Sequence, residues 1–264
     1  MSTNQRSTPR EGYRVPTGSL RQRAELATGD GAAPVSGALG PGALDDFEPR
    51  ERSEFASRVF NLLCALVMLV LLSPIMMVAA LLVAITSRGP VLYTQTRVGI
   101  DRRWSRTRAL HERRREDLGG IPFTIYKFRS MRVDAEINGQ AVWAKKDDDR
   151  VTGVGRFMRK SRIDELPQLF NVFRGDMNIV GPRPERPSIF VRLREQIDEY
   201  PVRQRVKPGI TGLAQICNPY DTSLDDVRRK VAFDIRYMRS QSLFEDIRIM
   251  ARTIPVMIFR IGGW

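Results

Sequence analysis

The residues best suited to chemistry are two adjacent carboxylates, Asp164 and Glu165, which follow a basic run. That run contains Arg156, Arg159, Lys160 and Arg162. Acids among fixed cations can hold a metal ion and a phosphorylated substrate in one site. A bare Asp-Glu pair is more often the solvated start of a helix, so the interpretation of this pair depends on its surroundings.

A helical pattern surrounds the acid pair. Apolar residues recur at intervals of about three and four positions between 156 and 173. Pro167 is tolerated only in the first turn of a helix, so we expect a helix to restart near 163–166, with the acid pair at its N-terminus. The helix dipole and the free N–H groups of that turn would favour anions there.

Further cations lie in two other segments. Apolar and polar residues alternate over 123–131, which predicts a strand with Lys127 and Arg129 on one face. Arg183 lies in a Gly-Pro-Arg-Pro turn. Such cations are typical of a solvated face, and they can also clamp a diphosphate. The candidate phosphate contacts are Lys127, Arg129, Arg159, Lys160 and Arg183.

A long uncharged segment precedes these elements. Residues 59–87 contain no charge over 29 positions. A straight helix of that length would extend about 43 Å, against roughly 30 Å for the hydrocarbon core of a bilayer. The Ser73-Pro74 pair near the middle predicts a kink, and the Ser73 hydroxyl can satisfy a carbonyl that the proline frees.

The flanks of this segment bear on its topology. Arginines lie on both sides, so the positive-inside rule places both ends in the cytoplasm. A re-entrant helix satisfies that rule, while an ordinary kinked transmembrane helix is also compatible with the residues alone. A soluble core helix of this length without charge is not expected.

The composition excludes several classes of protein. The net charge of +13 implies an anionic partner, which is nucleic acid, an anionic membrane surface or a phosphorylated small molecule. Two cysteines and one histidine exclude a disulfide scaffold and a Cys/His zinc site. Residues 1–52 predict a disordered tail without a cleavable secretory signal. The arginine-rich stretch 102–115 predicts a loop that faces solvent or lipid headgroups.

The C-terminal half is predicted to be mostly helical. We expect helices at 188–200 and through most of 223–259, with a turn-rich loop at 207–212. The mixture of arginines and large apolar residues in 223–259 suits helices in a membrane interface. The same mixture is compatible with core packing beneath a wet basic face.

The order of these features resembles the bacterial sugar transferase family, the monotopic phosphoglycosyltransferases that begin glycan assembly on a polyprenyl phosphate. The resemblance covers the chain from about residue 55 onward. The matching segments are the Ser73-Pro74 break, TQTRVG at 94–99, YKFRSM at 126–131, GVGRFMRKSRIDELPQLFNVFRGDMNIVGPRPERP at 153–187 and VKPGITGLAQI at 206–216. The insertion at 101–120 departs from many members, and 216–221 is closer to variants associated with exopolysaccharide loci.

The resemblance implies an enzyme that transfers a sugar 1-phosphate from a nucleotide diphosphate sugar, usually a UDP-sugar, to a polyprenyl phosphate such as undecaprenyl phosphate. UMP is the expected leaving group. Asp164 is implied to be the nucleophile of a covalent phosphosugar intermediate, and Glu165 is implied to help hold Mg²⁺. The family's break at Ser73 and Pro74 implies a re-entrant membrane helix, and hence a bacterial inner-membrane protein whose tail and catalytic domain face the cytoplasm.

The predicted fold is therefore an α/β, mainly helical catalytic domain with a re-entrant membrane helix hairpin, interfacial amphipathic helices and a small β element. Its expected parts are a basic tail at 1–52, the membrane helix at 53–87 and a membrane-associated catalytic domain at 88–264. The expected partners are the membrane and the two substrates, with no nucleic acid; a homo-oligomer is compatible with the sequence. The alternative function is a non-catalytic, membrane-anchored basic interaction module.

Overall fold

A computed structural model gives the fold of residues 47–103, 117–135, 148–218 and 223–258. Most of the predicted tail and most of the arginine-rich stretch lie outside these residues. The part that is described is mainly helical, as predicted, and contains small two-stranded sheets.

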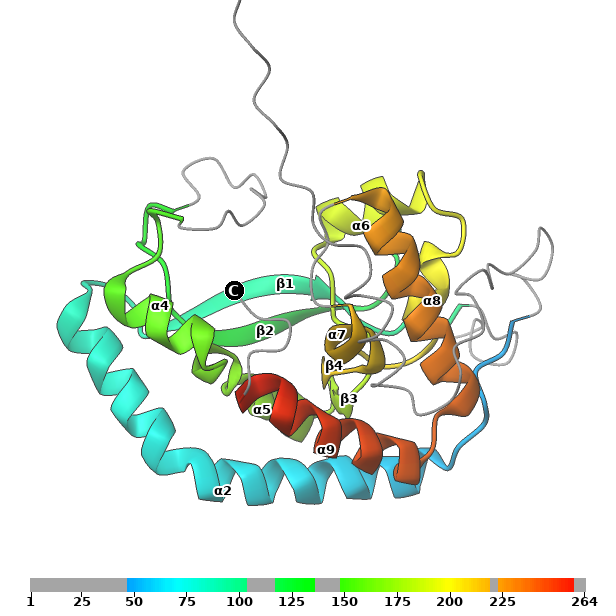
Figure 1. The fold of residues 1–264 in the computed structure, drawn as a ribbon, viewed down its shortest axis with the longest axis horizontal. Helices are drawn as coiled ribbons and strands as arrows, with labels where there is room; N and C mark the ends of the chain where they lie inside the picture. The colour runs from blue at the N-terminus through cyan, green and yellow to red at the C-terminus, as the bar shows by residue number, and fades with distance from the viewer. Residues whose placement is uncertain (1–46, 104–116, 136–147, 219–222, 259–264) are drawn as a thin grey trace, which may run out of the picture. The chain divides into compact units, whose positions relative to one another are not determined.

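The elements follow one another in the order shown in Figure 1. The strands are β1 (Leu92–Val98), β2 (Pro122–Phe128), β3 (Asn178–Val180) and β4 (Gly209–Thr211). The helices are α2 (Glu54–Thr86), α4 (Gly153–Lys160), α5 (Gln168–Arg174), α6 (Pro187–Arg194), α7 (Leu213–Cys217), α8 (Leu224–Ser240) and α9 (Leu243–Ile258). Two 3₁₀ turns, η1 (Ile163–Glu165) and η2 (Tyr200–Arg205), lie between them.

Helix α2 is continuous for 33 residues and bends around its middle (Figure 1). Pro74 lies inside the helix and has no N–H to donate to the carbonyl of Val70. The Ser73 hydroxyl donates to that carbonyl at 2.8 Å, so the predicted compensation is confirmed. The structure has one bent helix where a helix hairpin was predicted. The re-entrant path through a membrane stays a prediction.

Both halves of α2 pack against the elements that follow it. In the first half, the Asn61 side chain accepts a hydrogen bond from the Ile179 N–H at 2.6 Å, and Arg58 donates to two carbonyls at the end of α5. In the second half, Ala79 and Val83 pack against buried residues of β2 and α4. The helix is therefore fixed to one body on both sides of its bend.

The remaining surface of α2 is apolar. Within the described residues, α2 is the helix that is long and apolar enough to cross a membrane, by length and composition. Its large exposed side chains include Phe55, Leu63, Leu66, Val67, Val70, Leu71, Met77, Val78, Leu81 and Ile85. An exposed apolar surface of this extent is typical of contact with lipid or with another protein.

The two C-terminal helices differ in their packing. Helix α8 buries Val227, Val231 and Met238 in the core, so its apolar residues serve the core. Helix α9 leaves large apolar side chains exposed, including Phe244 and Ile254. Interfacial placement of these helices stays a prediction.

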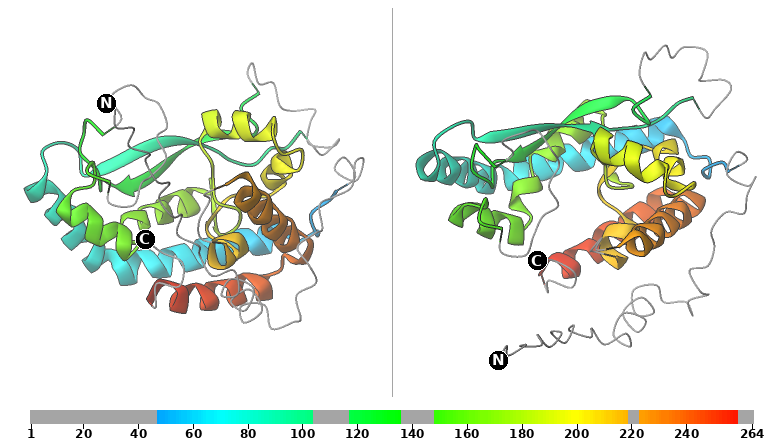
Figure 2. Two further views of the ribbon diagram at one scale, coloured as in Figure 1. Left: turned by 45° about the horizontal axis from the view of Figure 1, so that its top comes forward. Right: turned by 90° about the horizontal axis from the view of Figure 1, so that it is seen from above.

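Strands β1 and β2 form an antiparallel ribbon, which confirms the strand expected at 123–131, although it ends at Phe128. Arg97 pairs with Phe123 and Gln95 pairs with Ile125 in the register. Directly paired residues lie on one face of an antiparallel ribbon, and that face also carries Lys127. Helix α5 lies between β2 and α2 (Figure 2), so the ribbon stands over this helix.

Other boundaries differ from those predicted. The helix expected at 188–200 ends at Arg194. The loop expected at 207–212 contains β4, which pairs in parallel with β3. A strand of three residues is too short to show a recognisable alternation of apolar and polar residues. Its pairing also depends on residues that are distant in the sequence.

Candidate active site

The acid pair lies in the short turn between α4 and α5. Helix α4 ends at Lys160, Arg162 then adopts a left-handed backbone with φ 59°, and η1 carries both acids. A positive φ at a residue other than glycine is uncommon and is found most often at functional sites. Asp164 is 7% exposed and Glu165 is 8% exposed, so the turn buries two carboxylates side by side. A helix does restart in this region, but α5 begins at Gln168, so the acids lie in η1 and not at the helix N-terminus where they were predicted.

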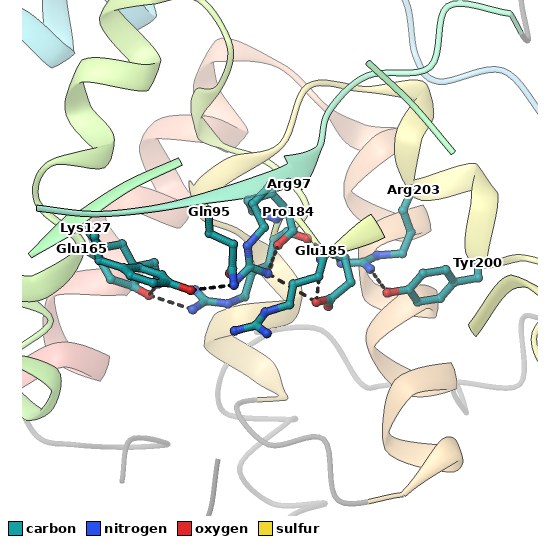
Figure 3. Close-up of polar contacts among 11 residues, drawn as sticks. Gln95, Arg97, Lys127, Glu165, Pro184, Glu185, Tyr200 and Arg203 are labelled. Atoms are coloured by element: carbon teal, nitrogen blue, oxygen red, sulfur yellow. Dashed lines mark hydrogen bonds and ion pairs between the residues drawn. The ribbon is translucent and has the colours of Figure 1, made fainter. Parts of the chain in front are cut away.

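Glu165 is held by cations from two other elements. Its Oε1 atom accepts hydrogen bonds from Lys127 Nζ at 2.8 Å and from Arg183 Nη2 at 2.7 Å, and its Oε2 lies 3.8 Å from Arg162 Nη1. Figure 3 shows Lys127 extending from the ribbon to this carboxylate. Burial alone would raise the pKa of Glu165, but the charges of Arg183 and Lys127 hold that pKa well below its usual value.

Asp164 has the opposite character. Its Oδ1 atom is buried and has no hydrogen-bond partner among the residues described. Burial, followed by the charge of Glu165, raises the pKa of Asp164 to about 6, although Lys127 and Arg159 oppose the shift. Two neighbouring acids whose environments push their pKa values apart are typical of a catalytic pair with divided roles.

Asn171 fixes the turn relative to the ribbon. Its Oδ1 accepts a hydrogen bond from the Tyr126 N–H at 3.2 Å, and its Nδ2 donates to the Thr124 carbonyl at 2.7 Å. The side-chain amide thus pairs with β2 as a neighbouring backbone would. These two hydrogen bonds fix the position of α5 along β2. Lys127 of β2 is then within hydrogen-bond distance of Glu165.

Arg183 is positioned from behind by Arg203. The Arg203 side chain is fully buried, and its Nη2 donates to the Arg183 carbonyl at 3.1 Å. Its Nε donates to Asp234 at 2.6 Å. Its Nη1 donates to the Tyr200 hydroxyl at 2.8 Å, as Figure 3 shows. All three guanidinium nitrogens are therefore paired, and the turn that carries Arg183 rests on a rigid support.

The predicted phosphate contacts separate into groups. Lys127 and Arg183 meet at the acid pair. Arg159, at the end of α4, lies close enough for its charge to act on Asp164, and Lys160 is exposed to solvent. Arg129 contacts another part of the protein, where its Nη2 donates to the Ser87 carbonyl at the end of α2 at 2.6 Å. The ribbon ends one residue before Arg129, so the face shared with Lys127 is lost there.

Comparisons with known proteins agree with the resemblance in the sequence. The model of the family described as "Bacterial sugar transferase" matches residues 52–260. The chain belongs to the bacterial sugar transferase family. This membership covers α2, the acid pair and nearly all of the elements described above.

Individual relatives give the same family assignment. Over 209 residues the chain is 39% identical to the UDP-N-acetylgalactosamine-undecaprenyl-phosphate N-acetylgalactosaminephosphotransferase of Aeromonas hydrophila, covering 79% of this chain and 45% of the relative. Over 212 residues it is 37% identical to the UDP-glucose:undecaprenyl-phosphate glucose-1-phosphate transferase of Caulobacter vibrioides, covering 80% of this chain and 72% of the relative. The chain thus spans less than half of the Aeromonas protein and most of the Caulobacter protein.

The sugar transferase site offers a small donor set for a metal. Within the described part of the chain, no group of three or more His, Cys, Asp or Glu side chains lies together. Mg²⁺ needs only one or two protein carboxylates where phosphate oxygens and water complete its shell. Glu165 Oε1 is shared by two cations, while Oε2 has only Arg162 Nη1 nearby, at 3.8 Å, and is the less crowded oxygen for a metal. The residues therefore fit a Mg²⁺ ion that arrives with a diphosphate, and do not fit one held by protein ligands alone.

Two residues of the candidate site were not predicted from the sequence. Arg97 and Gln168 line a small cavity together with Lys127 and Arg183. Both residues lie inside segments that resemble the family, at 94–99 and 153–187. The resemblance included these two positions but implied no role for either residue. Gln168 is uncharged and Arg97 lies far away in sequence, which is why neither stood out beside the acid pair.

Proposed function

We propose that this protein transfers a sugar 1-phosphate from a UDP-sugar to undecaprenyl phosphate with release of UMP, and so initiates assembly of an exopolysaccharide or another glycan. The observation that carries the proposal is the buried, unpaired Oδ1 of Asp164 beside a Glu165 that two cations fix in place. The substrates printed in the names of the Aeromonas and Caulobacter relatives support the substrate class.

The reaction takes two displacements at one phosphorus atom. A carboxylate oxygen of Asp164 attacks the β-phosphorus of the UDP-sugar, and the bond from that phosphorus to the oxygen shared with the α-phosphate breaks. UMP leaves with the electron pair, and the sugar phosphate stays on the enzyme as an acyl phosphate. A phosphate oxygen of undecaprenyl phosphate then attacks the same phosphorus, which frees the Asp164 carboxylate and gives the undecaprenyl diphosphate sugar.

The two carboxylates suit different steps. Asp164 has a raised pKa of about 6, so it is ionised near neutral pH and yet more basic than an ordinary aspartate. It has an unpaired oxygen to offer to phosphorus. Glu165 is pinned by Lys127 and Arg183, which suits a group that positions and does not react.

The residues also favour Mg²⁺ as the cofactor, with Glu165 as its protein ligand. Bound Mg²⁺ would neutralise the diphosphate and improve UMP as a leaving group. Lys127 and Arg183 already supply positive charge at Glu165. A further cation there is stable only together with the negative charge of the substrate.

The packing of α2 supports a re-entrant path at the cytoplasmic face of the membrane. A straight helix of 33 residues would be about 50 Å long. Residues on both sides of the bend contact the same catalytic unit, as Asn61 does with Ile179 and Val83 does in the cluster with β2. A helix that crossed the bilayer could not return to the same unit at its far end. The exposed apolar surface of α2 would then lie in one leaflet, near the phosphate of a lipid acceptor.

Trapping of the covalent intermediate tests the reaction. The full chain in membranes is incubated with Mg²⁺ and UDP-sugars labelled with ³²P in the β-phosphate, without acceptor. We expect label on the protein that Asp164→Asn abolishes, that the exposed control Asp225→Asn retains, and that undecaprenyl phosphate removes as labelled lipid. Label retained by Asp164→Asn would disprove the nucleophile.

The same preparation decides between an enzyme and an interaction module. UMP release that requires both Mg²⁺ and a UDP-sugar is the expected result. No release with any nucleotide sugar, together with tight and salt-sensitive binding of RNA or DNA, would favour the module.

Cysteine labelling tests the topology. In a background of Cys64→Ser and Cys217→Ser, single cysteines at Glu51 and Ser188 are exposed to a membrane-impermeant thiol reagent on intact cells. Neither is expected to react before the cells are opened. Reaction at position 51 alone would make α2 a true transmembrane span.

A further inference from the structure

A donor-lined cavity adjoins the acid pair. It is a small, open hollow with an inner volume of about 10 Å³, and its walls are Arg97, Ile125, Lys127, Gln168, Arg183 and Pro184. The register of the ribbon places Arg97, Ile125 and Lys127 on one face, above the first residue of α5. Four of the six lining side chains carry N–H groups, and two are apolar.

Two of these donors are buried without a partner. Arg97 Nε and Gln168 Nε2 have no hydrogen-bond acceptor anywhere in the portion of the chain that the structure describes. Gln168 is only 2% exposed, so its amide group cannot turn to bulk water. Buried N–H groups in folded proteins nearly always have an acceptor, and its absence costs stability. The cavity wall therefore contains two buried donors with the capacity to bind an acceptor.

The charge of the cavity indicates the sign of that acceptor. Lys127 and Arg183 share a single oxygen of Glu165, so positive charge remains after this pairing. Arg97 donates to the Pro184 carbonyl at 3.1 Å and has Glu185 at 3.4 Å (Figure 3). Burial and the nearby cations Arg183 and Arg186 lower the pKa of Arg97, while Glu185 opposes this shift. An anion in the cavity would relieve the repulsion among these cations.

We propose that Arg97 and Gln168 bind phosphoryl oxygens of the diphosphate of the nucleotide sugar and hold its phosphorus beside Asp164. The inference rests on the proposed function for the identity of the full substrate. A phosphoryl oxygen only accepts hydrogen bonds, as a pair of unpaired donors requires. A sugar hydroxyl must also donate, so it matches these two groups less well. Arg97 and Gln168 thereby add to Lys127 and Arg183 as contacts of the diphosphate.

Binding of a diphosphate without turnover tests this assignment. The full chain in detergent micelles is titrated by calorimetry with UDP and with inorganic pyrophosphate. Gln168→Met keeps the length of the side chain and removes its donor. We expect it to weaken both ligands about tenfold, because a hydrogen bond to a charged acceptor is lost.

A buried glutamine elsewhere provides the matched control. Gln241 is 5% exposed, and its Nε2 donates to the Arg50 carbonyl at 2.7 Å, at the end of α8. Gln241→Met also removes a buried amide, and it is expected to leave both affinities unchanged. Wild-type affinity of Gln168→Met for both ligands would overturn the proposal and assign the cavity to a trapped water molecule.

Arg97→Lys provides a second test of the diphosphate site if Gln168→Met fails to fold. It keeps the charge and loses the Nε–H, so we expect affinity for pyrophosphate to fall about fivefold. Unchanged affinity would again overturn the assignment. A wild-type protein that transfers sugar phosphate while both variants bind normally would refute this inference alone. Weakened binding in a protein with no transferase activity would refute the proposed function and leave the diphosphate site standing.

Discussion

Two clusters of cations and carboxylates lie on either side of Arg183, and they differ in how completely their polar atoms are paired. On one side, Arg183 and Lys127 bind Glu165. On the other side, Arg203 binds Asp234, and the two side chains are 0% and 2% exposed. We call these the dyad cluster and the support cluster.

The support cluster has no unpaired guanidinium nitrogen, because Asp234, the Tyr200 hydroxyl and the Arg183 carbonyl accept from Arg203. The dyad cluster leaves Asp164 Oδ1 and Gln168 Nε2 unpaired within the described residues. Buried polar atoms without a partner are rare, so the unpaired atoms beside the acid pair give the dyad cluster a capacity for binding that the support cluster lacks. We therefore expect substitutions in the dyad cluster to remove activity, and substitutions in the support cluster to lower the stability of the fold.

The largest expected effect is that of Asp164→Asn on turnover. Without the nucleophile, only substrate binding and electrostatic stabilisation can still accelerate the reaction. We therefore expect the rate of UMP release to fall by at least about 10⁴-fold, which corresponds to an increase of roughly 5.5 kcal/mol in the activation free energy. The protein should remain folded, as shown by thermal unfolding. Full turnover by this variant would remove the distinction between the two clusters.

The next effect is that of Arg203→Met on stability. This variant leaves Asp234 buried without its partner, and such losses cost about 3–5 kcal/mol. Chemical denaturation measures the change. The double variant Arg203→Met, Asp234→Leu removes the stranded charge and should recover most of the loss. A double variant as unstable as the single one would show that pairing of Asp234 is not what Arg203 contributes.

A third prediction uses pH to compare wild-type protein with Asp164→Asn in the absence of metal. The pKa of Asp164 is raised from 3.8 to about 6 in the folded protein, chiefly by burial. Folding therefore favours the protonated acid, so wild type loses stability as pH rises from about 4 to about 6, and the loss levels off above pH 6 at up to about 3 kcal/mol. Asparagine does not ionise, so the variant should gain stability over wild type as pH rises from about 4 to about 7.

Denaturation in EDTA at several pH values measures this gap. Such a gap would mean that the buried carboxylate of Asp164 lowers the stability of the fold, whereas the paired charges of the support cluster do not. A gap that stays constant from about pH 4 to 7 would show that Asp164 titrates as an exposed acid does.

Part of the site was predictable from the sequence, and the reasons are local. Asp164 and Glu165 are adjacent, Lys127 lies on an alternating strand, and Arg183 lies in a recognisable turn. Arg129 shows the limit of such reasoning. The alternation assigned it the same face as Lys127, but the strand ends at Phe128 and Arg129 contacts Ser87 instead. The end of a strand depends on its neighbours in space and not on its own pattern.

The support cluster and the cavity were beyond the sequence for a related reason. Arg203 and Asp234 are 31 positions apart, and no local pattern connects them. Gln168 looks like any polar residue at the start of a helix until its burial is known. The fold shows the same division: α2 and the ribbon follow from composition and periodicity, whereas β3 and β4 depend on pairing between distant segments.

The smallest expected effect concerns backbone strain next to the dyad cluster. Arg162 has φ 59°, the only positive φ outside glycine in the described ranges, and it immediately precedes η1. Both Arg162→Gly and Arg162→Ala remove the guanidinium that lies 3.8 Å from Glu165 Oε2. Only glycine also removes the steric cost of a Cβ atom in this conformation. We expect Arg162→Gly to be more stable than Arg162→Ala by about 1 kcal/mol, measured by urea denaturation.

The comparison of these two variants isolates the backbone, because the lost ion pair is common to both. A more stable glycine variant would mean that the dyad cluster holds its carboxylates in a turn that the chain does not prefer, as is typical of functional sites. Equal stability would mean that neighbouring contacts absorb the strain at Arg162. The dyad cluster would then differ from the support cluster only in its unpaired atoms, and its rigidity would come from Lys127, Arg183 and Asn171 rather than from the turn itself.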